Sequence, residues 1–536
     1  MTLTDFMLRV RGADRDRERA RHYERLRSKA ALADALEDQD ELAGHLDRLP
    51  KTGFPIGHAN TAAGLILMRV PREAALTSWL VMGSSGSGKT TAVKALYRWG
   101  LGNGLLIDMV DCKGDLYRPA LREIAAFVKP LPADVRAEFV KHLLVIKLSG
   151  DLVVPKNPCR LGPGTTAESV AYDLTLAFAR YSAAVGSALS VHMESVLRHS
   201  LLMMCEAKLS PLEIPLVLHH ETLRTTLALR SENPLVREFF LGIFPTLPPG
   251  SAPALAARLQ AAFMHDDVRL PFGADGNADF RDVILSGHRM VISLEKGGAP
   301  EAIVDLYGSL FIQDLCRSIF AAHGKGPPRL IFFDEFFHLL EAPAVAARFC
   351  TLLSSSRTFG VHPGFVMHQF AQAGREVREA LLANVGIALI FRTSEANATH
   401  LGDFLPASDA ALVERALRRG ESPPSRAATR AFLMERLQRQ ENRVAYLWDR
   451  RQPYNSVRVR IQDYREPHDV LGIGSEELDE FVEISGIARG GYAVSRDVVR
   501  RQIGERQERL LALAGAARPT PRGAAPRRKS GRPNLG

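Results

Sequence analysis

One nine-residue stretch near the start of the chain has the residue types and spacing of a phosphate-binding loop. It reads Gly83-Ser84-Ser85-Gly86-Ser87-Gly88-Lys89-Thr90-Thr91 and fits the pattern G-x-x-x-x-G-K-[ST] without a mismatch. Glycines let such a loop turn tightly, so that consecutive N–H groups and a helix N-terminus point at phosphate oxygens. We expect Lys89 to reach the β- and γ-phosphates of ATP and the Thr90 hydroxyl to hold Mg²⁺. The alternative is a Gly/Ser turn before an ordinary helix.

A pair of carboxylates further along the chain could complete such a site. Asp334 and Glu335 follow the apolar run Leu330-Ile331-Phe332-Phe333, which predicts a buried strand. Ligands of open α/β sheets bind at the C-terminal ends of the strands, where these carboxylates would emerge. We expect Asp334 to hold Mg²⁺ through water and Glu335 to polarise an attacking water molecule.

Three further residues have side chains suited to a nucleotide site. Gln369 ends the next predicted strand, where its amide could sense the γ-phosphate or orient water, or simply bond to the backbone. Arg357, within Ser354–Gly360, and Arg392, after Ile387–Phe391, could each act on the site of a neighbouring subunit. Either arginine could instead be a structural ion-pair partner.

Lys113 and Asp115 follow another predicted strand near the nucleotide side of the sheet. They could line a subunit interface or a DNA path, or form a turn with no chemistry.

The elements that must position these residues alternate between strand and helix. Apolar runs predict strands at 79–82, 105–111, 143–148, 289–294, 329–333, 364–368 and 386–391, with helices between most of them. This alternation predicts an α/β fold with a mostly parallel, doubly wound sheet. The runs at 444–448 and 456–461 predict an edge hairpin. Between 160 and 265 strand signals fade, which predicts a helical insertion that is either a lid or partner surface or only a packing domain.

We therefore divide the chain into six parts. They are a charged helical arm (1–50), the first part of the ATPase domain (51–158), the helical insertion domain (159–270), the second part of the ATPase domain (271–465), a small helical segment (466–513) and a disordered basic tail (514–536). The arm is either a solvated helix packed on the body or a subunit contact.

Composition indicates an ordinary globular protein of a reducing compartment. The 536 residues are 46% hydrophobic and 24% charged, and the five cysteines are scattered without a C-x-x-C pair. We find no signal peptide and no run of apolar residues long enough to cross a membrane. These features predict a cytoplasmic protein, with peripheral attachment to a membrane secretion complex left open.

The net charge of +9 is concentrated at one end of the chain. The tail from Ala516 carries six basic residues and no acid, which leaves +3 for the rest. A nucleic-acid groove in the folded body would therefore need a local arrangement of charge. The tail is either a nonspecific DNA tether or a solvated terminus.

Taken in order, these motifs resemble those of the HerA–FtsK superfamily, and most of all those of TraG-like conjugative coupling ATPases and HerA-like translocases. The resemblance covers roughly 76–465. It rests on Gly83–Thr91, Asp111-Cys112-Lys113-Gly114-Asp115-Leu116, Phe333-Asp334-Glu335, Ser356-Arg357-Thr358-Phe359-Gly360, Gln369, and Asn384-Val385-Gly386 followed by Phe391-Arg392-Thr393.

This resemblance implies a RecA-like P-loop NTPase fold and a homo-hexameric ring with ATP sites between subunits. It also implies DNA threaded through the ring without sequence preference. The chain departs from coupling proteins in lacking N-terminal membrane helices, and its charged N-terminal helix does not match the N-terminal barrel of HerA. The partner is left open between a relaxase with secretion proteins and a nuclease.

We thus expect an ATP-driven DNA translocase. One alternative is a secretion or pilus-assembly ATPase that does not grip DNA. The other is a non-catalytic nucleotide-binding scaffold.

Overall fold

The computed structural model describes residues 46–61, 64–147, 150–295, 300–341, 343–401, 404–405, 425–452 and 456–516. The predicted N-terminal arm up to residue 45 and the predicted basic tail beyond Ala516 lie outside the described residues.

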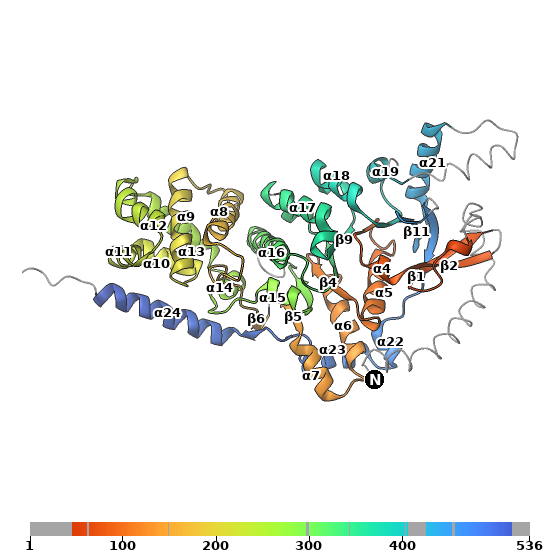
Figure 1. The fold of residues 1–536 in the computed structure, drawn as a ribbon, viewed down its shortest axis with the longest axis horizontal. Coiled ribbons are helices and arrows are strands. Elements are labelled where there is room, and N and C mark those ends of the chain that lie inside the picture. The colour runs from red at the N-terminus through yellow and green to blue at the C-terminus, as the bar shows by residue number, and fades with distance from the viewer. Residues whose placement is uncertain are drawn as a thin grey trace, which may run out of the picture.

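One large, mostly parallel sheet forms the centre of the molecule (Figure 1). Within the described ranges it has eleven strands, of which the seven from β10 to β5 run parallel and the other four antiparallel. In spatial order the strands are β2 (Gly64–Val70), β1 (Phe54–Thr61), β12 (Val457–Ile461), β11 (Val444–Asp449), β10 (Ile387–Phe391), β3 (Trp79–Met82), β9 (Val361–Met367), β8 (Arg329–Asp334), β4 (Leu106–Asp111), β7 (Arg289–Ser293) and β5 (Leu143–Lys147).

The central strands are apolar throughout because both faces of the sheet are covered. In β3, Trp79 and Val81 enter one hydrophobic core while Leu80 and Met82 enter the other. Helices on the first face are α4 (Arg72–Ala75), α5 (Lys89–Gly102), α6 (Tyr117–Val128), α7 (Ala133–Lys141), α22 (Pro467–Leu471) and α23 (Ser475–Ile484). Those on the second face are α15 (Phe280–Leu285), α16 (Glu301–Ala322), α17 (Pro343–Phe359), α18 (Arg375–Asn384), α19 (Glu395–Leu401) and α21 (Arg426–Arg439). The predicted doubly wound α/β fold is confirmed.

A cluster of helices interrupts the sheet between β5 and β7 and lies at the left of Figure 1. It contains α8 (Ala167–Ala184), α9 (Val191–Glu206), α10 (Ile214–His219), α11 (Glu221–Arg230), α12 (Pro234–Glu238), α13 (Ser251–Ala262) and α14 (Asp266–Gly273). The hydroxyls of Thr166 and Ser190 accept N–H bonds at the starts of α8 and α9, so both longest helices of the cluster have side-chain N-caps.

Short helical turns and one small sheet connect these parts. The turns are η1 (Leu46–Arg48), η2 (Pro211–Glu213), η3 (Phe239–Ile243), η4 (Phe244–Thr246), η5 (Phe337–Glu341) and η6 (Phe370–Gln372). The small sheet pairs β6 (Leu152–Val153) with β13 (Val494–Ser495) in antiparallel fashion.

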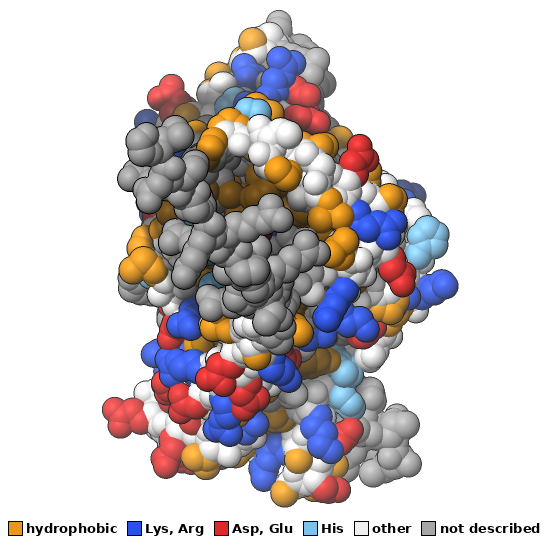
Figure 2. Space-filling model, turned by 90° about the vertical axis from the view of Figure 1, so that its left-hand side faces the viewer, with side chains coloured by type: hydrophobic (Ala, Val, Ile, Leu, Met, Phe, Trp, Pro, Cys, Tyr) orange, Lys and Arg blue, Asp and Glu red, His pale blue; other side chains and the backbone are white. Residues whose placement is uncertain are grey.

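Figure 2 views the end of the molecule formed by this helical cluster. On the coloured part of this face, basic, acidic and apolar side chains are interspersed, and no single charge sign dominates. That part of the surface does not present the uniform positive field that favours nucleic acid.

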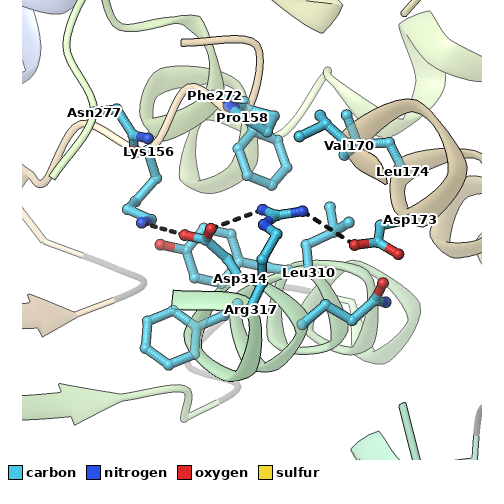
Figure 3. Close-up of a pocket in the computed structure, with 13 residues that line it drawn as sticks. Lys156, Pro158, Val170, Asp173, Leu174, Phe272, Asn277, Leu310, Asp314 and Arg317 are labelled. Carbon is cyan, nitrogen blue, oxygen red and sulfur yellow. Dashed lines mark hydrogen bonds and ion pairs between the residues drawn. The ribbon is translucent and has the colours of Figure 1, made fainter. Parts of the chain in front are cut away.

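The helical cluster is joined to the second face of the sheet by partly buried ion pairs around a small pocket (Figure 3). On α16, Asp314 binds Lys156 Nζ at 2.5 Å and Arg317 Nη2 at 2.8 Å. Arg317 Nη1 also lies 3.1 Å from Asp173 on α8, and Arg348 on α17 donates to both oxygens of the same carboxylate at 2.7 and 2.8 Å. Asp173 thus connects the cluster to two helices of the sheet's second face.

The last helix, α24 (Arg496–Ala516), runs along the underside of the helical cluster in Figure 1. Its Arg506 is buried and binds Glu213 Oε1 at 3.0 Å and Asp275 Oδ1 at 2.5 Å. The predicted helical segment therefore includes a helix that packs far from α23. The six predicted domain boundaries remain predictions.

The prediction of an edge hairpin was wrong in one respect. Strands β11 and β12 do pair in antiparallel fashion, but β1 pairs with β12 and β2 with β1, so the sheet edge is β2. The pairing of Gly57 with Ile461 joins residues from opposite ends of the chain, which a local pattern cannot reveal. Of the helices in the described ranges, none is long and apolar enough to span a bilayer.

Candidate nucleotide-binding site

The loop between β3 and α5 is fixed by strands and turns distant in sequence. Gly83 N–H donates to Met367 O at 3.2 Å, at the end of β9. Ser84 N–H donates to Arg392 O at 2.7 Å, just after β10. Ser87 O accepts from Arg443 N–H at 2.8 Å, just before β11. The loop therefore lies at the C-terminal ends of the parallel strands β3, β9 and β10, beside the start of the antiparallel strand β11.

Two glycines of the loop occupy positions that a larger residue cannot take easily. A Cβ on Gly83 would lie 2.6 Å from Phe391 Cβ and 2.8 Å from Ser87 Oγ. Gly88 has φ +117° at the N-cap of α5, in the left-handed region that favours glycine. Gly86, by contrast, has φ +70° with open space where its Cβ would be, so the apex of the loop faces an open side.

The Lys89 ammonium is held inside the loop by three acceptors. It donates to Gly83 O at 2.8 Å and Ser84 O at 3.0 Å, and it lies 3.0 Å from His368 Nδ1. Burial lowers the pKa of Lys89 to about 8, against the opposing charges of Glu335 and Asp334. Lys89 is poised at the base of the loop, where a phosphate oxygen could replace one of its acceptors.

The predicted carboxylate pair ends β8, beside this loop. Asp334 is 5% exposed and pairs in register with Asp111 on β4. Burial, the charge of Asp111 and that of Glu335 raise the pKa of Asp334 to about 8. Glu335 has φ +50°, a left-handed conformation that is strained for a non-glycine residue and often marks a functional site. Burial also raises the pKa of the Glu335 carboxyl.

The strand opposite Asp334 holds its own carboxylate in a turn. Asp111 accepts N–H bonds from Lys113, Gly114, Leu116 and Tyr117 at 2.7 to 3.0 Å. The turn brings Lys113 Nζ to 2.8 Å from Asp115 Oδ2 and 3.2 Å from His368 Nε2. Lys113 and Asp115 therefore belong to the same cluster of charges as Lys89 and Glu335.

The residues at this sheet edge fit a nucleoside triphosphate with Mg²⁺. Ser87 Oγ is buried without a hydrogen-bond partner in the described structure, and Thr90 lies half-buried in the first turn of α5. Across the described ranges no cluster of three or more His, Cys, Asp or Glu side chains could hold a metal ion. One hydroxyl and one carboxylate are the sparse protein ligands with which Mg²⁺ is held when phosphates supply the rest.

We compared the chain with known proteins. No protein-family model and no curated protein matches it. Among solved structures it resembles VirB4 of Thermoanaerobacter pseudethanolicus, with 13% identity over 77% of this chain and 97% of that one, at a TM-score of 0.50. The fold is that of VirB4.

The likeness to VirB4 confirms the predicted RecA-like P-loop fold. At 13% sequence identity the likeness establishes the fold alone. The bacterial conjugative coupling protein TrwBdeltaN70 matches with 16% identity over 79% of this chain and 93% of its own, at a TM-score of 0.44. The plasmid coupling protein TrwB in complex with ADP and Mg²⁺ matches with 15% identity over 81% and 94%, at a TM-score of 0.44.

Within this VirB4-like fold the remaining predicted residues lie in different places. Gln369 is exposed at the end of β9, and the neighbouring His368 is the residue that contacts Lys89. Sequence reasoning missed His368, although a histidine ending the strand next to Asp334 and Glu335 was a visible signal.

The two predicted arginines lie at opposite edges of the sheet. Arg392 is half-buried beside the phosphate-binding loop, where its carbonyl accepts a hydrogen bond from Ser84 N–H. Arg357 is exposed in the last turn of α17, which ends at Phe359, and β9 begins soon after, at Val361. Arg357 therefore lies near the N-terminal ends of the parallel strands. Its charge contributes to lowering the pKa of His362 at that edge, after burial. Arg357 therefore lies on the side of the sheet away from the phosphate-binding loop of its own chain.

Proposed function

We propose that this chain hydrolyses ATP with Mg²⁺ and uses the energy to move DNA as a ring of identical subunits, with a hexamer as the expected size. The observation that carries the proposal is the convergence of Lys89, Asp334 and Glu335 at one sheet edge, next to a complete phosphate-binding loop. A non-catalytic scaffold would not need all three side chains.

Each part of the site has a role in this proposal. The N–H groups of the loop from Gly83 to Thr91, together with the Lys89 ammonium, bind the phosphates. Thr90 and Asp334 hold Mg²⁺, which neutralises charge on the phosphates. Glu335 orients the attacking water and accepts a proton from it. Burial raises the pKa of the Glu335 carboxyl, which makes this carboxylate a stronger base. Gln369 is proposed to contact the γ-phosphate or the water once the exposed strand end closes over them.

The placement of the arginines supports a site shared between subunits. Because Arg357 lies at the edge opposite its own loop, it is the better candidate for insertion into a neighbour's site. Arg392 is then better suited to supporting the loop of its own subunit.

DNA as the moved substrate rests on the order of motifs along the chain. A ring that grips phosphates would show little sequence preference, and its DNA affinity would fall steeply with salt. A relaxase with secretion proteins, or a nuclease, remains the proposed class of partner, and the proposed location is the cytoplasm.

Steady-state ATP turnover of the full chain tests the proposal. We expect Mg²⁺-dependent turnover that rises with single- or double-stranded DNA of random sequence, with less stimulation at higher salt. Lys89→Ala and Glu335→Gln should abolish it, whereas Arg375→Ala, which removes an exposed pair with Glu379 on α18, should not. Turnover that survives either site substitution contradicts the catalytic assignment. If neither single- nor double-stranded DNA stimulates ATP turnover, the proposal that the protein moves DNA is contradicted, and a secretion or pilus-assembly ATPase is favoured.

A further inference from the structure

His368 is surrounded by residues from three separate elements of the proposed site. It follows β9, and its ring lies between the loop lysine of α5 and the side chains that follow β4 and β8. Its Nδ1 is 3.0 Å from Lys89 Nζ, and its Nε2 is 3.2 Å from Lys113 Nζ and 3.5 Å from Glu335 Oε1.

Each nitrogen of the ring faces one donor and one acceptor. Nδ1 lies next to the Lys89 ammonium and 3.1 Å from Gly83 O, and Nε2 lies next to the Lys113 ammonium and the Glu335 carboxylate. In the tautomer with the proton on Nε2, Nδ1 accepts from Lys89 and the Nε2 N–H faces Glu335, and the inference below uses this tautomer. Burial and the charges of Lys89 and Lys113 lower the pKa of His368, which keeps the ring neutral.

The backbone of His368 also contacts Glu335. A hydrogen bond from the His368 backbone N–H opposes the rise in the pKa of Glu335. His368 therefore contacts this carboxylate through both its backbone and its ring.

Of the three acceptors that hold Lys89, two are carbonyls of the loop itself and one is the imidazole. A phosphate that binds Lys89 must replace at least one of them. The imidazole belongs to the segment after β9 and not to the loop. Loss of its contact with Lys89 would therefore change the surroundings of a residue outside the loop.

We propose that His368 is a positioning residue that links the Lys89 ammonium to the Glu335 carboxylate, so that capture of phosphate by Lys89 sets the orientation of Glu335. This inference rests on the proposed ATPase function. The role of His368 differs from the one predicted for Gln369, which is to sense the γ-phosphate or to orient water.

Three substitutions separate the two ends of the ring. His368→Asn retains an acceptor near the position of Nδ1, His368→Gln places an amide near the position of Nε2, and His368→Ala removes both. We expect kcat for ATP to fall by about tenfold to hundredfold in the Ala and Asn variants, as a misplaced catalytic group does. The Gln variant should recover part of kcat because it can still donate to Glu335.

Binding and stability measurements complete the experiment. The affinity for the non-hydrolysable analogue ADPNP with Mg²⁺ and the melting temperature should stay close to those of the wild type in all three variants. His192→Gln, at an exposed position on α9, serves as the control and should leave kcat unchanged.

Two results would overturn the inference while leaving the ATPase function intact. One is wild-type kcat and ADPNP affinity in a folded Ala variant. The other is an equal loss of kcat in all three variants accompanied by an equal loss of melting temperature, which would mean that His368 only supports the fold. Absence of turnover in the wild-type protein would instead overturn the proposed function together with the inference.

Discussion

Asp334 ends β8 directly opposite Asp111 of β4, so that two carboxylates share one register position at the buried edge of the site. The surroundings of the two carboxylates differ. Asp111 accepts N–H bonds from the turn that follows it, whereas the pKa of Asp334 is raised to about 8 by burial, by Asp111 and by Glu335. Asp334, the buried carboxylate that its neighbours repel, is the one we propose to hold Mg²⁺.

This relationship predicts how stability depends on pH in the absence of metal and nucleotide. Asp334 titrates near 3.8 in the unfolded chain and near 8 in the folded one, so the folded state binds the extra proton between these values. The free energy of unfolding therefore falls as pH rises through this window. Asp334→Asn cannot ionise, and its melting temperature should exceed that of the wild type by a margin that grows from pH 5 to pH 8.

Thermal unfolding in a chelating buffer measures this margin. Glu379→Gln, on the exposed face of α18, should show no such trend. A margin for Asp334→Asn that is the same at both pH values would mean that the carboxylate is already ionised in the folded protein.

Two glycines of one loop should respond differently to the same substitution. Gly83→Ala forces a Cβ against Phe391 and Ser87, and we expect it to lower the free energy of unfolding by about 3 kcal/mol through overpacking. Gly86→Ala meets no neighbour within 4 Å and should cost about 1 kcal/mol for its left-handed backbone. Denaturation of both variants without nucleotide tests the difference, and equal losses would argue against the packing described for Gly83.

The ion pairs of Asp173 should contribute measurably to stability because the carboxylate that both arginines share is buried. Asp173→Asn leaves Arg317 and Arg348 without their shared carboxylate, and we expect a loss of about 2 to 3 kcal/mol. Glu435→Gln, which breaks an exposed pair with Arg439, provides the control and should have little effect. If both substitutions change the melting temperature equally, the joint around Asp173 is no stronger than a surface contact.

Mixtures of inactive subunits can show which arginine acts between them. Lys89→Ala subunits lack a working site but retain Arg357, and Arg357→Ala subunits retain a site. Their mixture should therefore regain ATP turnover that neither has alone. Mixing Lys89→Ala with Arg392→Ala should not restore turnover if Arg392 supports its own loop. The reverse pattern would assign the role between subunits to Arg392.

The parts of the site that could be predicted from sequence are those held within short stretches. The loop from Gly83 to Thr91 and the strand ending in Asp334 and Glu335 each combine an apolar run with polar residues at its end, so periodicity and motif indicated both. The same apolar runs predicted the doubly wound sheet. A strand that is buried on both faces has apolar residues at successive positions, whereas a strand with one exposed face alternates apolar and polar residues.

The remainder depends on which strands become neighbours. Nothing near residue 460 indicates that β12 pairs with β1, since the partner lies about 400 residues earlier. The importance of His368 likewise appears only when the ends of β4, β8 and β9 are brought together. Gln369 had the expected chemistry, yet β9 ends at Met367 and Gln369 is exposed, whereas His368 contacts Lys89.

The phosphate-binding loop is contiguous in sequence but its supports are not. One is the carbonyl of Arg392, and another is the N–H of Arg443, which binds Ser87. A ribosome making this chain therefore releases the complete motif long before it releases the residues that shape it. During most of synthesis the nascent protein therefore contains the complete loop sequence without the hydrogen bonds from residues 392 and 443 that fix its conformation. We expect the loop to bind nucleotide only after translation has passed residue 443.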